Sequence, residues 1–204
     1  MSDVPNLVLG RIADMLKYPC RNAALGCLVA TLLTEKNDHE RSCPFRHFKC
    51  LFSTCQWTGF KNAILPHLRS THSPLLLEGR RHQIDVELTA TPTNTDWAIY
   101  CFDRIFRFNV FQLFRESNIY ASVYLVGGSG RAIGNTESDF TYTVTVKGPS
   151  DAQTSNTWQT QDDETVIANH IPERCFSIPS DRLQYFVRYG DVLRFHVELN
   201  LRVV

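Results

Sequence analysis

The chain has 204 residues, 43% of them hydrophobic and 21% charged, a composition typical of a globular protein long enough to bury a sizeable core. Its 21 Lys and Arg balance 21 Asp and Glu, and no apolar run is long enough to span a membrane. Residues 1–72 carry 9 basic and 5 acidic side chains, an excess too small to argue for a nucleic-acid-binding protein.

Residues 1–18 are predicted to form a helix and connector. Val8, Ile12, Met15 and Leu16 recur at helical spacing, and Tyr18-Pro19 ends the pattern. Two interpretations stay open: the helix packs on the segment that follows, or it connects to an upstream domain.

Residues 19–72 contain a repeated arrangement of Cys and His. The first half reads C-x6-C-x11-H-x3-C and the second C-x4-C-x11-H-x4-H. Zinc prefers four Cys and His ligands in a tetrahedron, and a site filled by four protein ligands has no open position for catalysis. We therefore predict two structural zinc ions in tandem fingers, Cys3His then Cys2His2, with ligands Cys20, Cys27, His39, Cys43 and Cys50, Cys55, His67, His72.

Two short helices should present these ligands. A helix capped by Thr34 puts His39 and Cys43 on one face, and a second helix over residues 62–71 carries the last two histidines. Pro66 should kink that second helix or limit it to one or two turns. The five-residue step between its two histidines also requires some distortion at its end. His47, between the sites, is interpreted as a packing or surface residue rather than an alternative ligand.

The alternative is that the cysteines form disulfides or are simply buried. Seven cysteines are an odd number and no signal peptide is recognisable, so a disulfide framework fits poorly. Cys101 and Cys175 are isolated and expected to be reduced and buried. This pattern predicts a location in the cytoplasm or also the nucleus.

Residues 73–204 predict an all-β antiparallel sandwich with one short helix before the last strand. Strands are expected where apolar and polar residues alternate or β-branched and aromatic residues gather, with a turn at Gly127–Gly130. Residues 150–164 are predicted to be a polar loop anchored by Trp158, and Ser180 is predicted to cap a helix over residues 181–187. The expected strands are residues 84–89, 105–114, 119–126, 140–146, 175–179 and 192–204.

No catalytic constellation is found. The glycines from Gly127 to Gly134 do not have phosphate-loop spacing, and no nucleophile elbow surrounds Ser129. The acidic run at residues 162–164 is typical of a solvated loop, and His82, His170 and His196 are scattered.

Several motifs together resemble one family. They are Tyr-Pro-Cys20 with Gly-Cys27, Glu35-Lys36 with Asp38-His39-Glu40, Cys55-Gln-Trp57-x-Gly59, Pro66-His67-Leu68, Asp96-Trp97 and Tyr189-Gly190-Asp-Val-Leu. They resemble the C-terminal region of Seven-in-absentia (Sina/Siah) proteins. The resemblance implies two zinc fingers followed by a TRAF-like sandwich. In that family this unit is the dimeric substrate- and adaptor-binding region of a RING-type E3 ubiquitin ligase, which directs bound proteins to ubiquitination and proteasomal degradation.

The chain departs from that family in lacking a RING. A RING needs about eight further Cys and His ligands, and the remaining candidates are dispersed. We therefore expect no ligase activity from this chain alone, because E2 would be recruited only through a RING. It is either a fragment or a RING-less relative, such as an adaptor that dimerises with a full-length family member. Nucleic-acid binding through the fingers is a third, weaker hypothesis. The C-x4-C at Cys50 and Cys55 is also shorter than the usual family loop.

The resemblance further implies a groove for extended peptides with a Pro-x-Ala-x-Val-x-Pro core. Such peptides bind as an added strand, with main-chain hydrogen bonds giving affinity and side-chain pockets giving specificity. By similarity the groove maps to Leu75, Leu77, Thr95, Trp97 and Ile99, several of which differ in type from the family.

Overall fold

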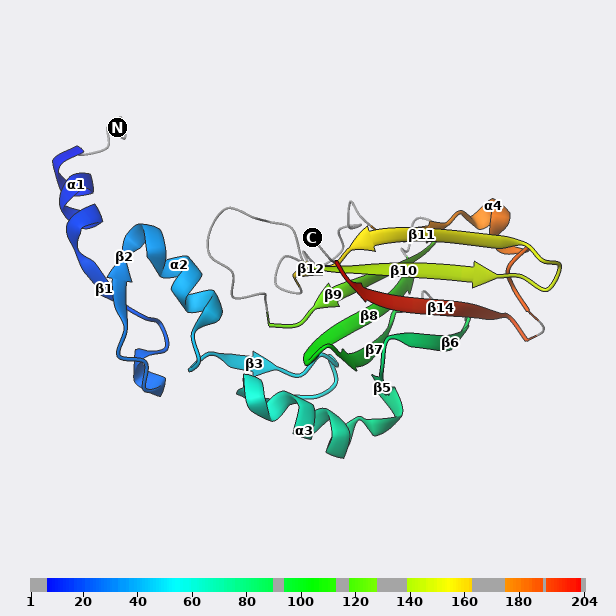
Figure 1. Ribbon diagram of the computed structural model, residues 1–204, viewed down its shortest axis with the longest axis horizontal. Helices are drawn as coiled ribbons and strands as arrows, with labels where there is room; N and C mark the ends of the chain where they lie inside the picture. The colour runs from blue at the N-terminus through cyan, green and yellow to red at the C-terminus, as the bar shows by residue number, and fades with distance from the viewer. Residues whose placement is uncertain are drawn as a thin grey trace.

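The N-terminal part of the chain consists of short helices and three-residue strands, and the C-terminal part of two packed β-sheets (Figure 1). This computed structural model describes residues 7–89, 94–112, 118–127, 139–162, 175–188 and 190–202. Within these ranges no helix is both long and apolar enough to cross a membrane.

The first finger lies at one end of the molecule and β3 leads from it toward the sheets (Figure 1). Its strands β1 and β2 form an antiparallel pair that holds the two sides of a Cys-containing loop. Its elements are α1 (Leu7–Met15), β1 (Lys17–Pro19), η1 (Ala23–Leu25), β2 (Ala30–Leu32) and α2 (Leu33–Ser42). The predicted cap at Thr34 is wrong, because α2 begins two residues earlier than that cap implies, directly after β2, and Leu32 occupies the N-cap without a side-chain hydrogen bond.

The second finger is a β-hairpin followed by a helix: β3 (His47–Lys49), β4 (Thr58–Phe60) and α3 (Lys61–Thr71). α3 runs for 11 residues through Pro66, so the prediction of one or two turns is wrong. Pro66 removes only one intrahelical hydrogen bond, to the carbonyl four residues earlier, while burial of Ile64 and Leu68 stabilises the whole helix.

The first sheet of the sandwich has four antiparallel strands in the order β11-β10-β14-β6. They are β11 (Gln153–Gln159), β10 (Phe140–Lys147), β14 (Val192–Leu201) and β6 (Arg81–Glu87). β11 contradicts the predicted loop over residues 150–164. Its sequence is nearly all polar because it is an edge strand with one solvated face, so it lacks the apolar alternation used for prediction.

The second sheet has the order β12-β9-β8-β7-β5, and β13 also pairs with β9. Its pairs are antiparallel except for β5 with β7 and β12 with β9, which are parallel. The strands are β5 (Leu76–Glu78), β7 (Asn94–Cys101), β8 (Arg104–Gln112), β9 (Ile119–Leu125), β12 (Gln161–Asp162) and β13 (Phe176–Ile178). The short η2 (Ser73–Leu75) leads into β5.

The core lies between the two sheets and combines aliphatic side chains with several phenylalanines. Phe106, Phe108, Phe176 and Phe195 are fully buried there, and the rings of Phe108 and Phe176 both meet Phe195 edge-on. Alternation along β10 and β14 turns every second residue inward. The predicted antiparallel sandwich is thus confirmed.

The single helix before the last strand is also confirmed, but α4 (Ser180–Leu183) is one turn long rather than seven residues. The rest of the expected segment forms turns, with Phe186 buried in the core. Most of the predicted Gly127–Gly130 turn, the acids at 163–164, His170 and the last two residues lie outside the described ranges.

Candidate metal centres

The first predicted ligand set is gathered at one point by three elements. Cys20 follows β1, Cys27 lies in the loop before β2, and His39 and Cys43 come from the last turn and C-cap of α2. All four ligand atoms lie within 4.8 Å of one another. The three cysteines are buried and are not in disulfides.

The separations within this cluster fit zinc. Sγ of Cys20 lies 3.7 Å from Sγ of Cys43, and Sγ of Cys27 lies 3.4 Å from Nε2 of His39. With Zn–S bonds of about 2.3 Å and Zn–N bonds of about 2.0 Å, tetrahedral ligands are separated by about 3.5–3.8 Å. A disulfide would need sulfurs about 2 Å apart. The cluster is therefore able to bind zinc.

Polar groups around the cluster suit bound thiolates. Burial alone would raise the pKa of the Cys43 thiol, but the neighbouring Asn22 side chain and Phe45 backbone outweigh it and lower the pKa. Nδ2 of Asn22 is buried without an ordinary hydrogen-bond acceptor. Burial raises the pKa of Cys20, and a bound cation would favour its thiolate form.

Glu40 is a supporting residue that reasoning from the sequence did not single out. Its carboxylate is buried, and it accepts hydrogen bonds from the Arg21 backbone N–H at 2.8 Å and from the Arg21 guanidinium at 2.7 Å. Burial would raise the pKa of Glu40, but Arg21 and the charge of Lys36 outweigh it and lower the pKa. The contact joins the loop after Cys20 to the helix that carries His39. In the sequence, the sign of this supporting role is that Glu40 directly follows the ligand His39.

The second predicted set is gathered by the β3–β4 loop and α3. Nε2 of His72 lies 3.4 Å from Sγ of Cys50, and Nε2 of His67 lies 3.3 Å from Cys50 and 3.6 Å from Cys55. All four ligand atoms are again within 4.8 Å of one another. Burial and the neighbouring His72 lower the pKa of His67, which favours the neutral imidazole that metals bind.

The end of α3 shows the expected distortion. His72 is the C-cap, with φ −126° and ψ 29°, so it leaves the helix while its N–H still bonds to the Leu68 carbonyl at 2.9 Å. This non-helical step brings the two histidines to one site although they are five residues apart.

An aromatic stack supports the second cluster from outside. The Trp57 ring lies parallel to the His67 ring, with centroids 4.4 Å apart and planes 4° apart. Gly59 makes room for it, because a Cβ there would lie 2.4 Å from Cζ2 of Trp57. Here the glycine is required for space rather than for backbone conformation.

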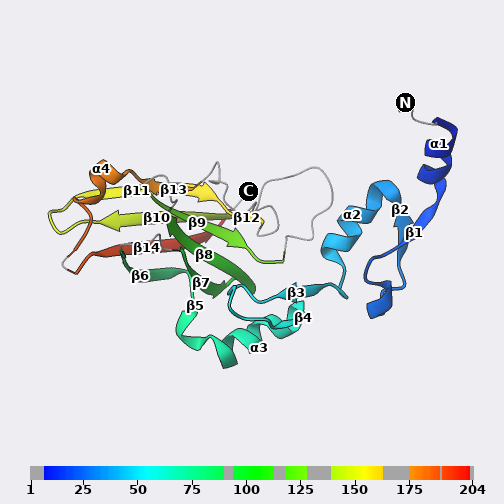
Figure 2. The same ribbon diagram turned by 180° about the vertical axis from the view of Figure 1, so that it is seen from behind.

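The second finger is packed on the sandwich, whereas the first has almost no apolar core. Leu51, Phe52, Ile64 and Leu68 form one buried cluster with the sandwich residues Ala98, Ile105 and Val126. In the described part of the first finger, the buried hydrophobic cluster consists of Cys20, Cys27 and Cys43. Figure 2 shows α3 and β4 lying beside β5 and β7 at the end of the sandwich.

The remaining cysteines and His47, which were not predicted to bind zinc, lie outside both clusters. Burial raises the pKa of Cys101 to about 11 and that of Cys175 to about 11, so both stay protonated at neutral pH. His47 lies on β3 with its ring edge-on to Phe60, 4.6 Å between centroids, as expected for a packing residue.

The five predicted peptide-contact residues lie along neighbouring elements. Leu77 on β5 pairs with Ile99 on β7, and both contact the sandwich core, Ile99 with no exposed surface. Trp97 is half-buried with its ring 5.8 Å from that of Phe108, and Thr95, also half-buried, is two residues away. Leu75 ends η2 and packs against the finger cluster.

Comparison with known proteins shows which family the metal centres resemble. Residues 11–83 match the family model described as Sina, zinc finger. The chain is 29% identical to the E3 ubiquitin-protein ligase sina of Drosophila melanogaster over 115 residues, covering 52% of this chain and 35% of that protein. It is 30% identical to siah2 of Xenopus laevis and to SIAH2 of Homo sapiens over 112 residues, half of this chain. The matched stretch spans about a third of these relatives' length.

A solved structure, TRAF5 of Notothenia coriiceps, aligns with 70% of this chain and 85% of its own at 12% identity and a TM-score of 0.44. Likeness at this level does not bear on function. The zinc-finger match contains all eight clustered residues. Residues 11–83 are therefore similar to the Sina zinc finger, and a β-sandwich follows them.

Proposed function

We propose that this chain is the substrate- and adaptor-recognition region of a Sina-type E3 ubiquitin ligase. Two structural zinc ions hold the fingers, and the sandwich binds an extended segment of the partner protein by strand addition. The curated relatives are named as E3 ubiquitin-protein ligases, which supports the pathway. Delivery of bound proteins to the proteasome follows from the same proposal.

One observation carries the binding mode: β7 has an open edge. β8 pairs with β7 along Asn94–Cys101, but on the other side β5 covers only Ala98–Tyr100. In the described part of the chain, no strand pairs with residues 94–97 on that side. An extended segment added there would use the free main-chain groups of β7.

The side chains near this edge suit an apolar segment. Trp97 and Leu77 are half-buried and border the open edge, so they can contact an added strand. Ile99 is fully buried and would support the site from beneath rather than touch the ligand. Thr95 and Leu75 flank the same region.

The exposed surface of the first finger also favours a protein partner. Eight large hydrophobic side chains with exposures from 37% to 96% lie between residues 12 and 45: Ile12, Met15, Leu16, Leu25, Leu28, Val29, Leu33 and Phe45. Such surfaces mark protein contacts. A nucleic-acid-binding surface would instead present basic side chains. Arg69 of α3 forms an ion pair with Glu78 at 3.0 Å.

The binding mode is tested with a labelled Pro-x-Ala-x-Val-x-Pro peptide in a fluorescence anisotropy titration. We expect binding, and we expect a version N-methylated at alternate residues to lose most of it, because methylation removes the donors that add to the strand. Equal binding of both peptides would exclude strand addition.

The ligase role is tested by fusing a RING domain to the N-terminus. With E1, E2 and a bound substrate, the fusion should build ubiquitin chains on that substrate and the chain alone should not. If the fusion modifies itself but not the bound substrate, the chain is instead a non-catalytic adaptor or dimerisation partner. Sedimentation of the zinc-loaded chain alone, and mixed with a family member, tests the proposed homodimer and heterodimer.

A further inference from the structure

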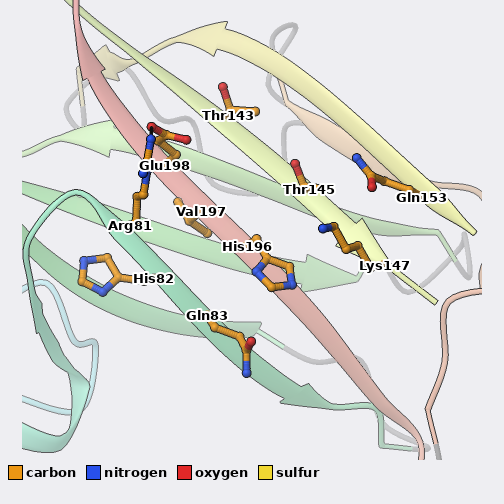
Figure 3. A pocket seen from close by; sticks show the side chains of 10 residues that line it. All are labelled: Arg81, His82, Gln83, Thr143, Thr145, Lys147, Gln153, His196, Val197 and Glu198. Atoms are coloured by element: carbon orange, nitrogen blue, oxygen red, sulfur yellow. Dashed lines mark hydrogen bonds and ion pairs between the residues drawn. The ribbon is translucent and has the colours of Figure 1, made fainter. Parts of the chain in front are cut away.

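The outward face of the four-stranded sheet carries an open hollow of about 430 Å³, lined by side chains from all four strands (Figure 3). No metal ligand and no residue of the β7 edge contributes to it. The residues that matter for its chemistry are Gln83, Thr145, Lys147, Gln153, His196 and Glu198.

Strand register fixes the centre of this hollow. His196 on β14 lies opposite Thr145 on β10 and Gln83 on β6. One step along the same face, Arg194 lies opposite Asp85, and Lys147 lies opposite Gln153. His196 is therefore surrounded by donors on three strands, as Figure 3 shows for the labelled side chains.

The acidic side chains near His196 already form ion pairs with arginines, whereas two nearby basic side chains have no acidic partner. Glu198 accepts from Arg81 at 2.8 Å, and Asp85 accepts two hydrogen bonds from Arg194 at 2.7 and 2.6 Å. Among the described residues Lys147 and Arg188 have no acidic partner within 4 Å.

Arg188 lies beside Lys147, and the hydrogen-bond donors of the Arg188 guanidinium are only partly satisfied. Its guanidinium donates to the Lys147 carbonyl at 3.4 Å, and its Nε is buried without a hydrogen-bond partner. This local positive excess lies in residues 73–204, which carry 12 basic and 16 acidic side chains.

The same excess of positive charge affects the pKa of His196. Burial and the charges of Lys147, Arg194 and Arg188 lower its pKa, and the charge of Asp85 only partly opposes them. The imidazole is thus neutral at pH 7 and can donate one hydrogen bond to an acceptor in the hollow.

We propose that this hollow binds a carboxylate of an acidic peptide segment, with Lys147 as the ion partner and His196 and Gln83 as hydrogen-bond donors. The fork of Arg194 is occupied by Asp85, and Arg188 does not line the hollow, so the lining cation without an acidic partner is Lys147 and no guanidinium is free there for bidentate recognition of phosphate. The amide of Gln153 and the hydroxyl of Thr145 are placed to meet main-chain groups of such a segment. The site is independent of the proposed ligase function.

The test is an NMR titration of the zinc-loaded chain with end-blocked tetraglutamate, sodium acetate and inorganic phosphate, following the His196 imidazole. Tetraglutamate should bind tightest and raise the pKa of His196, because a bound anion favours the protonated ring. Lys147→Ala should weaken tetraglutamate binding about threefold to fivefold, as expected for a partly exposed ion pair, and Lys147→Arg should preserve it.

Lys17→Ala, at an exposed lysine on β1, is the matched control and should leave the affinity unchanged. Three results would overturn the proposal: an unmoved His196 at millimolar tetraglutamate, tighter binding of phosphate than of tetraglutamate, or equal weakening by Lys17→Ala. Because Lys147 is exposed, its replacement should not disturb folding, and the amide spectrum of the variant verifies this in the same experiment.

Discussion

Single residues around the clusters decide how firmly the ligands are held, and Glu40 is the clearest case. Its buried carboxylate accepts hydrogen bonds from Arg21, next to the ligand Cys20, and its own helix carries His39 and ends at the C-cap Cys43. Replacing a group that orients a ligand in this way typically lowers metal affinity about 10-fold to 100-fold.

Glu40→Gln should lower the zinc affinity of the first cluster about 10-fold to 100-fold. The amide keeps the shape but loses the charge that holds Arg21, so the Cys20 loop is less well oriented. Competition with a chromophoric chelator measures the affinity. Glu35→Gln, on an exposed position of the same helix, should have no effect; similar losses in both variants would assign the effect to helix charge instead.

Gly59→Ala should destabilise the second finger by about 1–3 kcal/mol, as overpacking does. The added methyl would lie 2.4 Å from the Trp57 ring and displace it from His67. Thermal unfolding of the zinc-loaded protein measures the change. Gly10→Ala is the contrasting variant: nothing lies within 4 Å of its Cβ in α1, so it should be neutral or stabilise the helix by about 0.5–1 kcal/mol. An unchanged melting curve for Gly59→Ala would refute the role of the stack.

The Asp85–Arg194 pair makes stability depend on pH. The hydrogen bonds from Arg194 lower the pKa of Asp85, so its contribution is complete above the ordinary carboxyl pKa of about 3.9 and is lost as the pH falls through the lower, folded value. Asp85→Asn should cost about 0.5–1 kcal/mol at pH 7, and the difference from the parent should shrink below pH 4. Urea unfolding of both proteins measures this difference, since acid release of zinc affects them alike. A constant difference would assign the loss to packing.

At the scale of elements, the ligand spacing was sufficient to predict both clusters. Cys and His have few reasons to recur at 11-residue spacing other than a shared metal, and the step to His72 even predicted its departure from the helix. The extent of α3 could not be predicted in the same way. The effect of Pro66 is local, but the burial that outweighs it depends on Ala98 and Ile105, more than 30 residues away in sequence.

The strands of the sandwich likewise differ in how well the sequence predicts them. Strands with one buried face, such as β10 and β6, show alternating apolar residues and were predicted within a few residues. β11 is held by its register with β10, including hydroxyl pairs of Thr143 with Thr157 and Thr145 with Ser155, at 2.8 and 2.7 Å. Such pairs exist only once the neighbouring strand is known, so a polar edge strand resembles a loop in the sequence.

At the scale of the whole molecule, the two fingers depend on metal to different degrees. In the described part of the first finger the buried side chains are three cysteines, Asn22 and Glu40, so apart from the metal the main link between α2 and the Cys loop is the contact of Glu40 with Arg21. The second is also attached to the sandwich through Ile64, Leu68 and their partners. Metal binding contributes about 10–16 kcal/mol to folding of small fingers, which is more than the other contacts of the first finger can replace.

Chelation should therefore unfold the first finger while leaving α3 and the sandwich folded. In hydrogen exchange after treatment with a strong chelator, residues 7–45 should lose protection, while α3 and the strands of both sheets keep most of theirs. Leu68→Ala removes a fully buried anchor and should cost about 2–5 kcal/mol, so chelation should then expose α3 as well. Simultaneous loss of protection in both fingers of the parent protein would mean that the apolar contacts of α3 with β7 and β8 are too weak to hold it, and that zinc alone maintains the second finger.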